Sequence, residues 1–193
     1  MLYLILFKKG IKTREKGGVL QKIMQKVIAS VIDDVLNNFS ETLNHSGILF
    51  DSRIHSVTNP LLKKCLYNYK DGFPTEPARN AMNSTVSEQA AAFLRSLSEQ
   101  GWEIALCTNR DLRFAFGTTQ TWLSDQKIPC DYLVQTADPV GFCRKAGIHF
   151  LISDRPSDFF SDLAVFYCPV QYLQNLWRRC SCDFEDVRKC LPK

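Results

Sequence analysis

Two adjacent carboxylates, Asp33 and Asp34, directly follow an apolar run from Val27 to Ile32. The run predicts a buried strand, and the residues after the acids predict a helix. Side chains between a strand and the next helix lie at the carboxyl edge of an open α/β sheet, where such sheets bind ligands. We therefore take this turn as a candidate site, because carboxylates can bind hard cations or act as bases.

A second apolar run, Ile104–Cys107, ends in polar residues that suit phosphate chemistry. It is followed by Thr108, Asn109 and Arg110. A hydroxyl and the unpaired N–H groups at a helix start can hold phosphate oxygens, and an arginine supplies a matching charge.

A third apolar run, Phe150–Ile152, leads into Ser153, Asp154 and Arg155. The carboxylate of Asp154 is a candidate cation ligand, and Arg155 is a second candidate for binding an anion. The regular alternation of strands and helices brings the ends of parallel strands to one edge.

In this order, the segments resemble the motifs of the haloacid dehalogenase-like superfamily. Thr118–Leu123 and Ile128–Leu133 resemble its bacterial 5′(3′)-deoxyribonucleotidase-like branch in particular. The resemblance covers about residues 26–190 and implies an α/β fold with a Rossmann-like, three-layer parallel sheet and a small helical cap insertion. It also implies descent from an Mg²⁺-dependent phosphatase or nucleotidase.

The register of the first motif decides whether the chain has a catalytic nucleophile. In that superfamily the attacking Asp stands two positions before a second Asp. The register that fits makes Asp33 the second acid and Asp34 the third, so that Val31 occupies the nucleophile position. The other register, with Asp33 as nucleophile, puts Val35 at the second acid and lengthens the strand by two residues. Valine has no lone pair with which to attack phosphorus.

Two further motif positions depart from the superfamily pattern. Pro139 stands where the resemblance implies a charge-neutralising lysine, and we expect Arg144 and Lys145, one to two turns onward, to face solvent. Ser153 replaces the first acid of an Asp-Asp pair. Asp33, mainly through its backbone carbonyl, and Asp154 remain as implied metal ligands, so we expect Mg²⁺ binding to be weak at most.

The resulting hypothesis is a pseudophosphatase whose pocket binds a phosphorylated small molecule or another anion. Its implied ligand-binding residues are Asp34, Thr108, Asn109, Arg110 and Arg155.

Two alternatives stay open. One is an active Mg²⁺-dependent phosphatase with an atypical site, in which Asp33 and Thr108 are catalytic and Asp33 or Asp34 acts as a base on water. The other is a protein-interaction module that uses aromatic residues such as Phe159, Phe160, Tyr172 and Trp177.

Composition restricts the class of protein only mildly. The chain has 193 residues, 45% of them hydrophobic, and a net charge of +4, which predict one sizeable core without a dense basic stripe for nucleic acid. The apolar run at residues 2–7 is too short to span a membrane. Eight mostly isolated cysteines are typical of free thiols, so we expect a cytoplasmic protein.

The predicted organisation is a core formed by residues 24–46 and 84–193, interrupted by a cap at 47–83. Residues 1–23 are interpreted as an N-terminal extension or a mis-assigned start. The strands are expected at 27–32, 102–107, 132–135, 149–152 and 164–168, and the helices at 35–44, 61–69, 86–100, 112–126, 139–146, 157–163 and 184–191.

Overall fold

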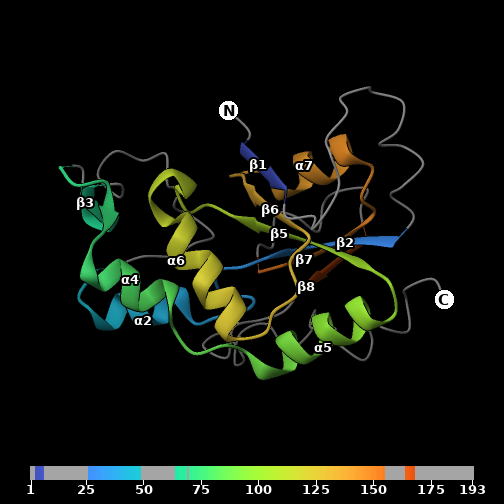
Figure 1. Ribbon diagram of the computed structural model, residues 1–193, viewed down its shortest axis with the longest axis horizontal. Helices are drawn as coiled ribbons and strands as arrows, with labels where there is room; N and C mark the ends of the chain where they lie inside the picture. The colour runs from blue at the N-terminus through green and yellow to red at the C-terminus, as the bar shows by residue number, and fades with distance from the viewer. Residues whose placement is uncertain (1–2, 7–25, 49–63, 69, 155–163, 168–193) are drawn as a thin grey trace.

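The computed structural model describes residues 3–6, 26–48, 64–68, 70–154 and 164–167, which form a mixed α/β fold around one main sheet (Figure 1). The strand order of that sheet is β1-β6-β5-β2-β7-β8. Its strands are β1 (Tyr3–Leu6), β2 (Val27–Val31), β5 (Glu103–Thr108), β6 (Tyr132–Gln135), β7 (Phe150–Ser153) and β8 (Ala164–Tyr167). The predicted Rossmann-like α/β class is confirmed.

All neighbouring strands pair in parallel from β6 through β5, β2 and β7 to β8, whereas β1 pairs antiparallel with β6. Every residue of β2 is buried, as expected for a central strand covered on both faces. Along the chain, the strands that follow β2 lie first on one side of it (β5 and β6) and then on the other side (β7 and β8). This change of direction makes the carboxyl end of β2 a topological switch point. The hypothesis of a mis-assigned start for residues 1–23 stays a prediction, although Tyr3–Leu6 pairs with the sheet.

Helices cover both faces of the sheet, with α5 and α7 on opposite sides of it in Figure 1. The helices of the core are α5 (Glu88–Glu99), α6 (Leu112–Asp125) and α7 (Pro139–Ala146). One apolar cluster packs residues of α5 and α6 against the sheet, and another packs residues of α7 against it. The predicted three layers are therefore present.

Side-chain caps fix where these helices begin. Ser87, Asp111 and Asp138 are the N-caps of α5, α6 and α7, and each accepts a backbone N–H of the first turn. Val86 forms an antiparallel bridge with Asn37, which keeps the chain extended up to Ser87.

The cap region lies beyond the carboxyl ends of the parallel strands (Figure 1). The described elements of the predicted cap, residues 47–83, are α4 (Glu76–Met82) and a hairpin of β3 (Tyr67–Asn68) and β4 (Phe73–Pro74). The helix α2 (Phe39–His45), which the prediction assigned to the core, packs with them. These elements share a separate apolar cluster that also includes Ala115 of α6.

Two expected helices differ from the structure. The helix expected at 35–44 begins only at Phe39, because Asp34 has a left-handed backbone (φ 64°) and Asn37 forms bridges that interrupt any helix. In the described part of the helix expected at 61–69, residues 64–66 are helical and Tyr67 begins β3. The helices expected at 157–163 and 184–191 lie outside the described residues.

The four cysteines of the described ranges are free thiols. Cys107 and Cys143 are buried, Cys65 is exposed and Cys130 is partly buried. Burial, with a smaller effect of Asp131, raises the pKa of the Cys130 thiol to about 12. The buried thiols therefore act as small apolar packing residues.

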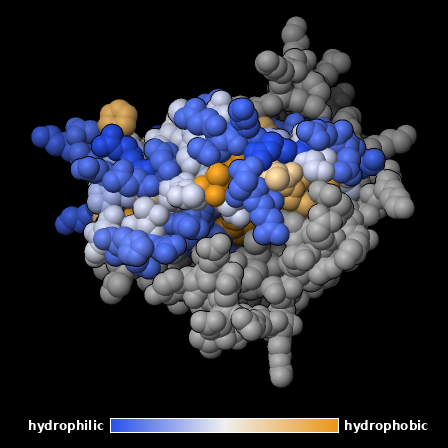
Figure 2. Space-filling model, turned by 90° about the horizontal axis from the view of Figure 1, so that it is seen from below, coloured by the Kyte–Doolittle hydropathy of each residue, from blue (hydrophilic) through white to orange (hydrophobic). Residues whose placement is uncertain are grey.

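The described helices include none long and apolar enough to cross a membrane. Seen from below, the described surface is mostly hydrophilic, with apolar residues in small separate patches (Figure 2).

Candidate functional site

The predicted motif residues meet at the carboxyl edge of the sheet because of the pairing of β2. Val31 lies opposite Cys107 of β5, and Ser30 lies opposite Ile152 of β7. The residues that follow these strands therefore converge at the switch point. Consistent with this register, the Thr108 hydroxyl lies 3.2 Å from a carboxylate oxygen of Asp33.

A buried ion pair between Asp33 and Arg110 occupies the centre of this edge. Nε of Arg110 lies 2.9 Å from Oδ1 and 3.1 Å from Oδ2 of Asp33, and Nη2 lies 2.6 Å from Oδ1. The side chains are 2% and 9% exposed. Two nitrogens of the guanidinium thus bind the carboxylate, Nε through both oxygens and Nη2 through Oδ1, as charge-assisted hydrogen bonds.

The rest of the Arg110 side chain is also bound inside the protein. Nη1 donates to Oγ1 of Thr119 at 3.0 Å, and Nη2 donates to the Met82 carbonyl at 3.3 Å. The guanidinium carbon lies 5.6 Å from the ring centre of Phe39 and 6.0 Å from that of Trp122. Arg110 therefore connects the first motif to α2, α4 and α6.

Thr108 is committed to the same network. Its hydroxyl donates to Asp33 and accepts the backbone N–H of Arg110 at 3.0 Å. In this arrangement the hydroxyl orients the ion pair. Asn109, the next residue, is partly buried.

Asp34 binds the start of α2, whereas Asp33 binds Arg110. Its carboxylate accepts the backbone N–H of Ser40 at 2.8 Å and also accepts the Ser40 hydroxyl. The N-cap of α2, Asn38, makes no side-chain capping bond. Asp34 therefore satisfies a donor at the start of α2, from the left-handed backbone that an Asp can adopt.

The nucleophile position of the resemblance is apolar and buried. Val31 is 4% exposed and belongs to the main hydrophobic cluster. Ser153 and Asp154 at the end of β7 are 0% and 2% exposed.

Whether this edge holds magnesium stays a prediction, and the contacts of Asp33 oppose it. Both oxygens of Asp33 already accept hydrogen bonds from cationic or hydroxyl donors. Within the described ranges, no three His, Cys, Asp or Glu side chains group closely enough to hold a metal. Mg²⁺ prefers several oxygen ligands in octahedral geometry, and Arg110 supplies the positive charge that a cation would otherwise provide.

Position 139, where the resemblance implies a lysine, carries no charge. Pro139 is buried in the first turn of α7, where proline suits a helix start. Arg144 and Lys145 are exposed, as expected. Arg155 lies outside the described residues.

No protein-family model and no curated protein matches the chain. Because one fold supports many chemistries, the functional conclusion rests on the geometry of these side chains.

Four contacts of Arg110 were absent from the sequence analysis as functional residues: Phe39, Thr119, Trp122 and the carbonyl of Met82. For Thr119 a signal exists, since it shares one buried helix face with Ala115 and Trp122. A hydroxyl on an otherwise apolar face indicates a buried partner. The Met82 carbonyl has no such signal, because backbone acceptors look alike in sequence.

Proposed function

We propose that this chain is a haloacid dehalogenase-like pseudophosphatase, in which the former catalytic edge serves as a structural centre. The observation that carries the proposal is the combination of a buried Val31 at the end of β2 with an Asp33 carboxylate held by Arg110. The strand order around β2 and the meeting of Asp33 with Thr108 support the family resemblance.

The contacts of three side chains support a loss of phosphoryl transfer. Covalent attack needs a nucleophile at position 31, where the side chain is a hydrocarbon. Acid–base work by Asp33 needs a carboxylate that reaches substrate, but this one faces Arg110 and Thr108. Asp34, the other candidate base, is bound to the start of α2.

The same contacts oppose the binding of a phosphorylated small molecule at this edge. An anion could use Arg110 only by displacing Asp33 from it. The two residues form a fork with three contacts of 3.1 Å or less. We therefore propose a non-catalytic role, with any anion at this edge in competition with Asp33.

The test is an activity screen of the purified full chain on p-nitrophenyl phosphate and deoxynucleoside monophosphates, with and without Mg²⁺. We expect hydrolysis no faster than in buffer. Turnover on the order of 1 s⁻¹ that disappears in Asp33→Asn would overturn the proposal and favour the active-enzyme alternative. The interaction-module alternative rests on Phe159, Phe160, Tyr172 and Trp177, which lie outside the described residues.

A further inference from the structure

An open cavity of about 720 Å³ lies at the far end of the cap, between the β3–β4 hairpin and the start of α4. Its walls come from residues between Lys64 and Arg79, so it contains neither Asp33 nor Arg110. Small-molecule sites usually have volumes of about 300–1,000 Å³. The cavity is therefore large enough for a ligand and separate from the motif edge.

Three basic side chains surround this cavity: Lys64, Lys70 and Arg79. All three are exposed, and the salt bridges of the described residues include none of them. Two acids, Asp71 and Glu76, also line the cavity, and Asp71 accepts a hydrogen bond from the side-chain amide of Asn68. Three cations against two acids leave the lining with a small positive excess, which favours an anion over a cation.

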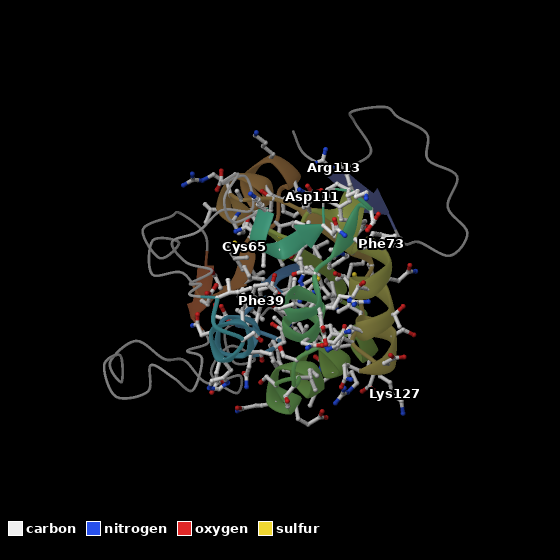
Figure 3. All side chains as sticks on the ribbon, turned by 90° about the vertical axis from the view of Figure 1, so that its left-hand side faces the viewer. Phe39, Cys65, Phe73, Asp111, Arg113 and Lys127 are labelled. Atoms are coloured by element: carbon white, nitrogen blue, oxygen red, sulfur yellow. The ribbon has the colours of Figure 1, made fainter. Side chains whose placement is uncertain are left out.

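An aromatic wall stands beside these charges. Phe73 is 68% exposed and is the one large hydrophobic residue that is exposed in the described part of the chain. Figure 3 views the molecule from this end and labels Phe73 on the same side as Asp111 and Arg113. An exposed ring beside cations suits a ligand that has both a flat apolar part and a negative charge.

The core holds the hairpin in place without a ligand. The Tyr67 hydroxyl accepts the backbone N–H of Asp111 at 2.8 Å, and the Tyr67 ring packs on Phe114 with centroids 5.5 Å apart. Burial raises the pKa of the Tyr67 phenol, so it stays neutral. Gly72 has a left-handed backbone (φ 72°), and a Cβ there would lie 3.2 Å from Phe114. The cavity is thus pre-formed, which lowers the cost of binding.

We propose that this cavity binds a small anion that carries an aromatic ring, as an aryl phosphate or an aryl carboxylate does. The ring lies against Phe73, and the negative group is held by Lys70 and Arg79. The site is independent of the proposed function of the motif edge, so either can fail without the other.

The test is calorimetric titration of the full chain with phenyl phosphate, benzoate, inorganic phosphate and benzyl alcohol. We expect phenyl phosphate or benzoate to bind with a Kd of about 1 mM or tighter, and more tightly than inorganic phosphate or benzyl alcohol. The better of the two anions identifies the charged group.

Two variants separate the charged and aromatic contributions. Lys70→Gln combined with Arg79→Gln should weaken binding about two- to thirtyfold, as the loss of two exposed ionic contacts implies. Lys145→Gln, which removes an exposed lysine from α7, is the matched control and should leave affinity unchanged. Phe73→Ala should weaken aryl-anion binding about two- to tenfold and leave the affinity for inorganic phosphate as it was.

All these positions are exposed, so the variants should fold, and their circular dichroism spectra should match the wild type. Failure of both aryl anions to bind the wild-type protein would overturn the proposal. So would unchanged aryl-anion affinity in either cavity variant, or inorganic phosphate that binds as tightly as the better of the two aryl anions.

Discussion

Breaking the Asp33–Arg110 ion pair from one side should destabilise the protein far more than removing it from both sides. Arg110→Met leaves a buried carboxylate with the Thr108 hydroxyl as its remaining partner in the network, and Asp33→Val leaves a buried guanidinium without its anion. A buried charge that loses its partner cannot recover its hydration. The double variant leaves no charge to desolvate.

The magnitudes follow from the contacts. Loss of one partner of a buried pair typically costs about 3–5 kcal/mol, so Asp33→Val should lower the free energy of unfolding by that amount. Arg110→Met also loses the bonds to Thr119 and to the Met82 carbonyl, together worth about 1–2 kcal/mol, for a total of about 4–7 kcal/mol. The double variant should cost only about 1–2 kcal/mol, chiefly the bonds that Thr119 and Met82 lose.

The assay is equilibrium urea unfolding, followed by tryptophan fluorescence and circular dichroism. The sum of the two single effects should exceed the double effect by at least about 5 kcal/mol. A single variant that fails to fold but is recovered by the second substitution reports the same coupling. Glu88→Gln, which breaks the exposed Arg95–Glu88 pair, is the control and should cost less than about 1 kcal/mol. Strict additivity of the Asp33 and Arg110 effects would refute the reasoning.

Two further predictions concern the lost chemistry and the helix ends. Val31→Asp alone should leave phosphatase activity at the buffer level, whereas the triple change Val31→Asp, Pro139→Lys and Ser153→Asp should gain measurable Mg²⁺-dependent activity. Equal activity from the single change would mean that the lysine and the metal ligand were never limiting. Gly147→Ala should lower the free energy of unfolding by about 1 kcal/mol, because Gly147 ends α7 at φ 69°. Gly117→Ala, with open space inside α6, should raise it by about 0.5–1 kcal/mol in the same urea assay, and equal signs for the two would contradict this account.

Local signals in the sequence predicted much of the core. The bounds expected for β6 and for α7 agree with the structure, since Pro139 starts α7 and Gly147 ends it in the left-handed conformation. The hairpin of the cap was missed because each of its strands has two residues, too few for a periodic pattern. The start of α2 was misplaced because Val35 and Leu36 continue the helical spacing, although Asp34 turns the chain before them.

The position of the site could be predicted from the sequence, but the binding partner of Arg110 could not. Strand ends and their polar residues predicted that Asp33 and Thr108 would meet, as they do. The sequence analysis assigned Arg110 to an external anion, whereas in the structure it binds Asp33, which lies 77 positions away in the chain. A cation at a strand end looks the same whether its anion is a ligand or a distant carboxylate. Only tertiary pairing distinguishes the two.

The strand order also constrains how this protein folds. The first core strand, β2, lies between β5 and β7, and Ile28 pairs both with Ile104 and with Phe150. The contacts at the centre of the sheet therefore join segments that are far apart along the chain, which corresponds to a high contact order and slow folding. During synthesis β5 can pair with β2 first, but the other edge of β2 stays unpaired until β7 has left the ribosome, and in that interval this edge is open to aggregation or to binding by a chaperone.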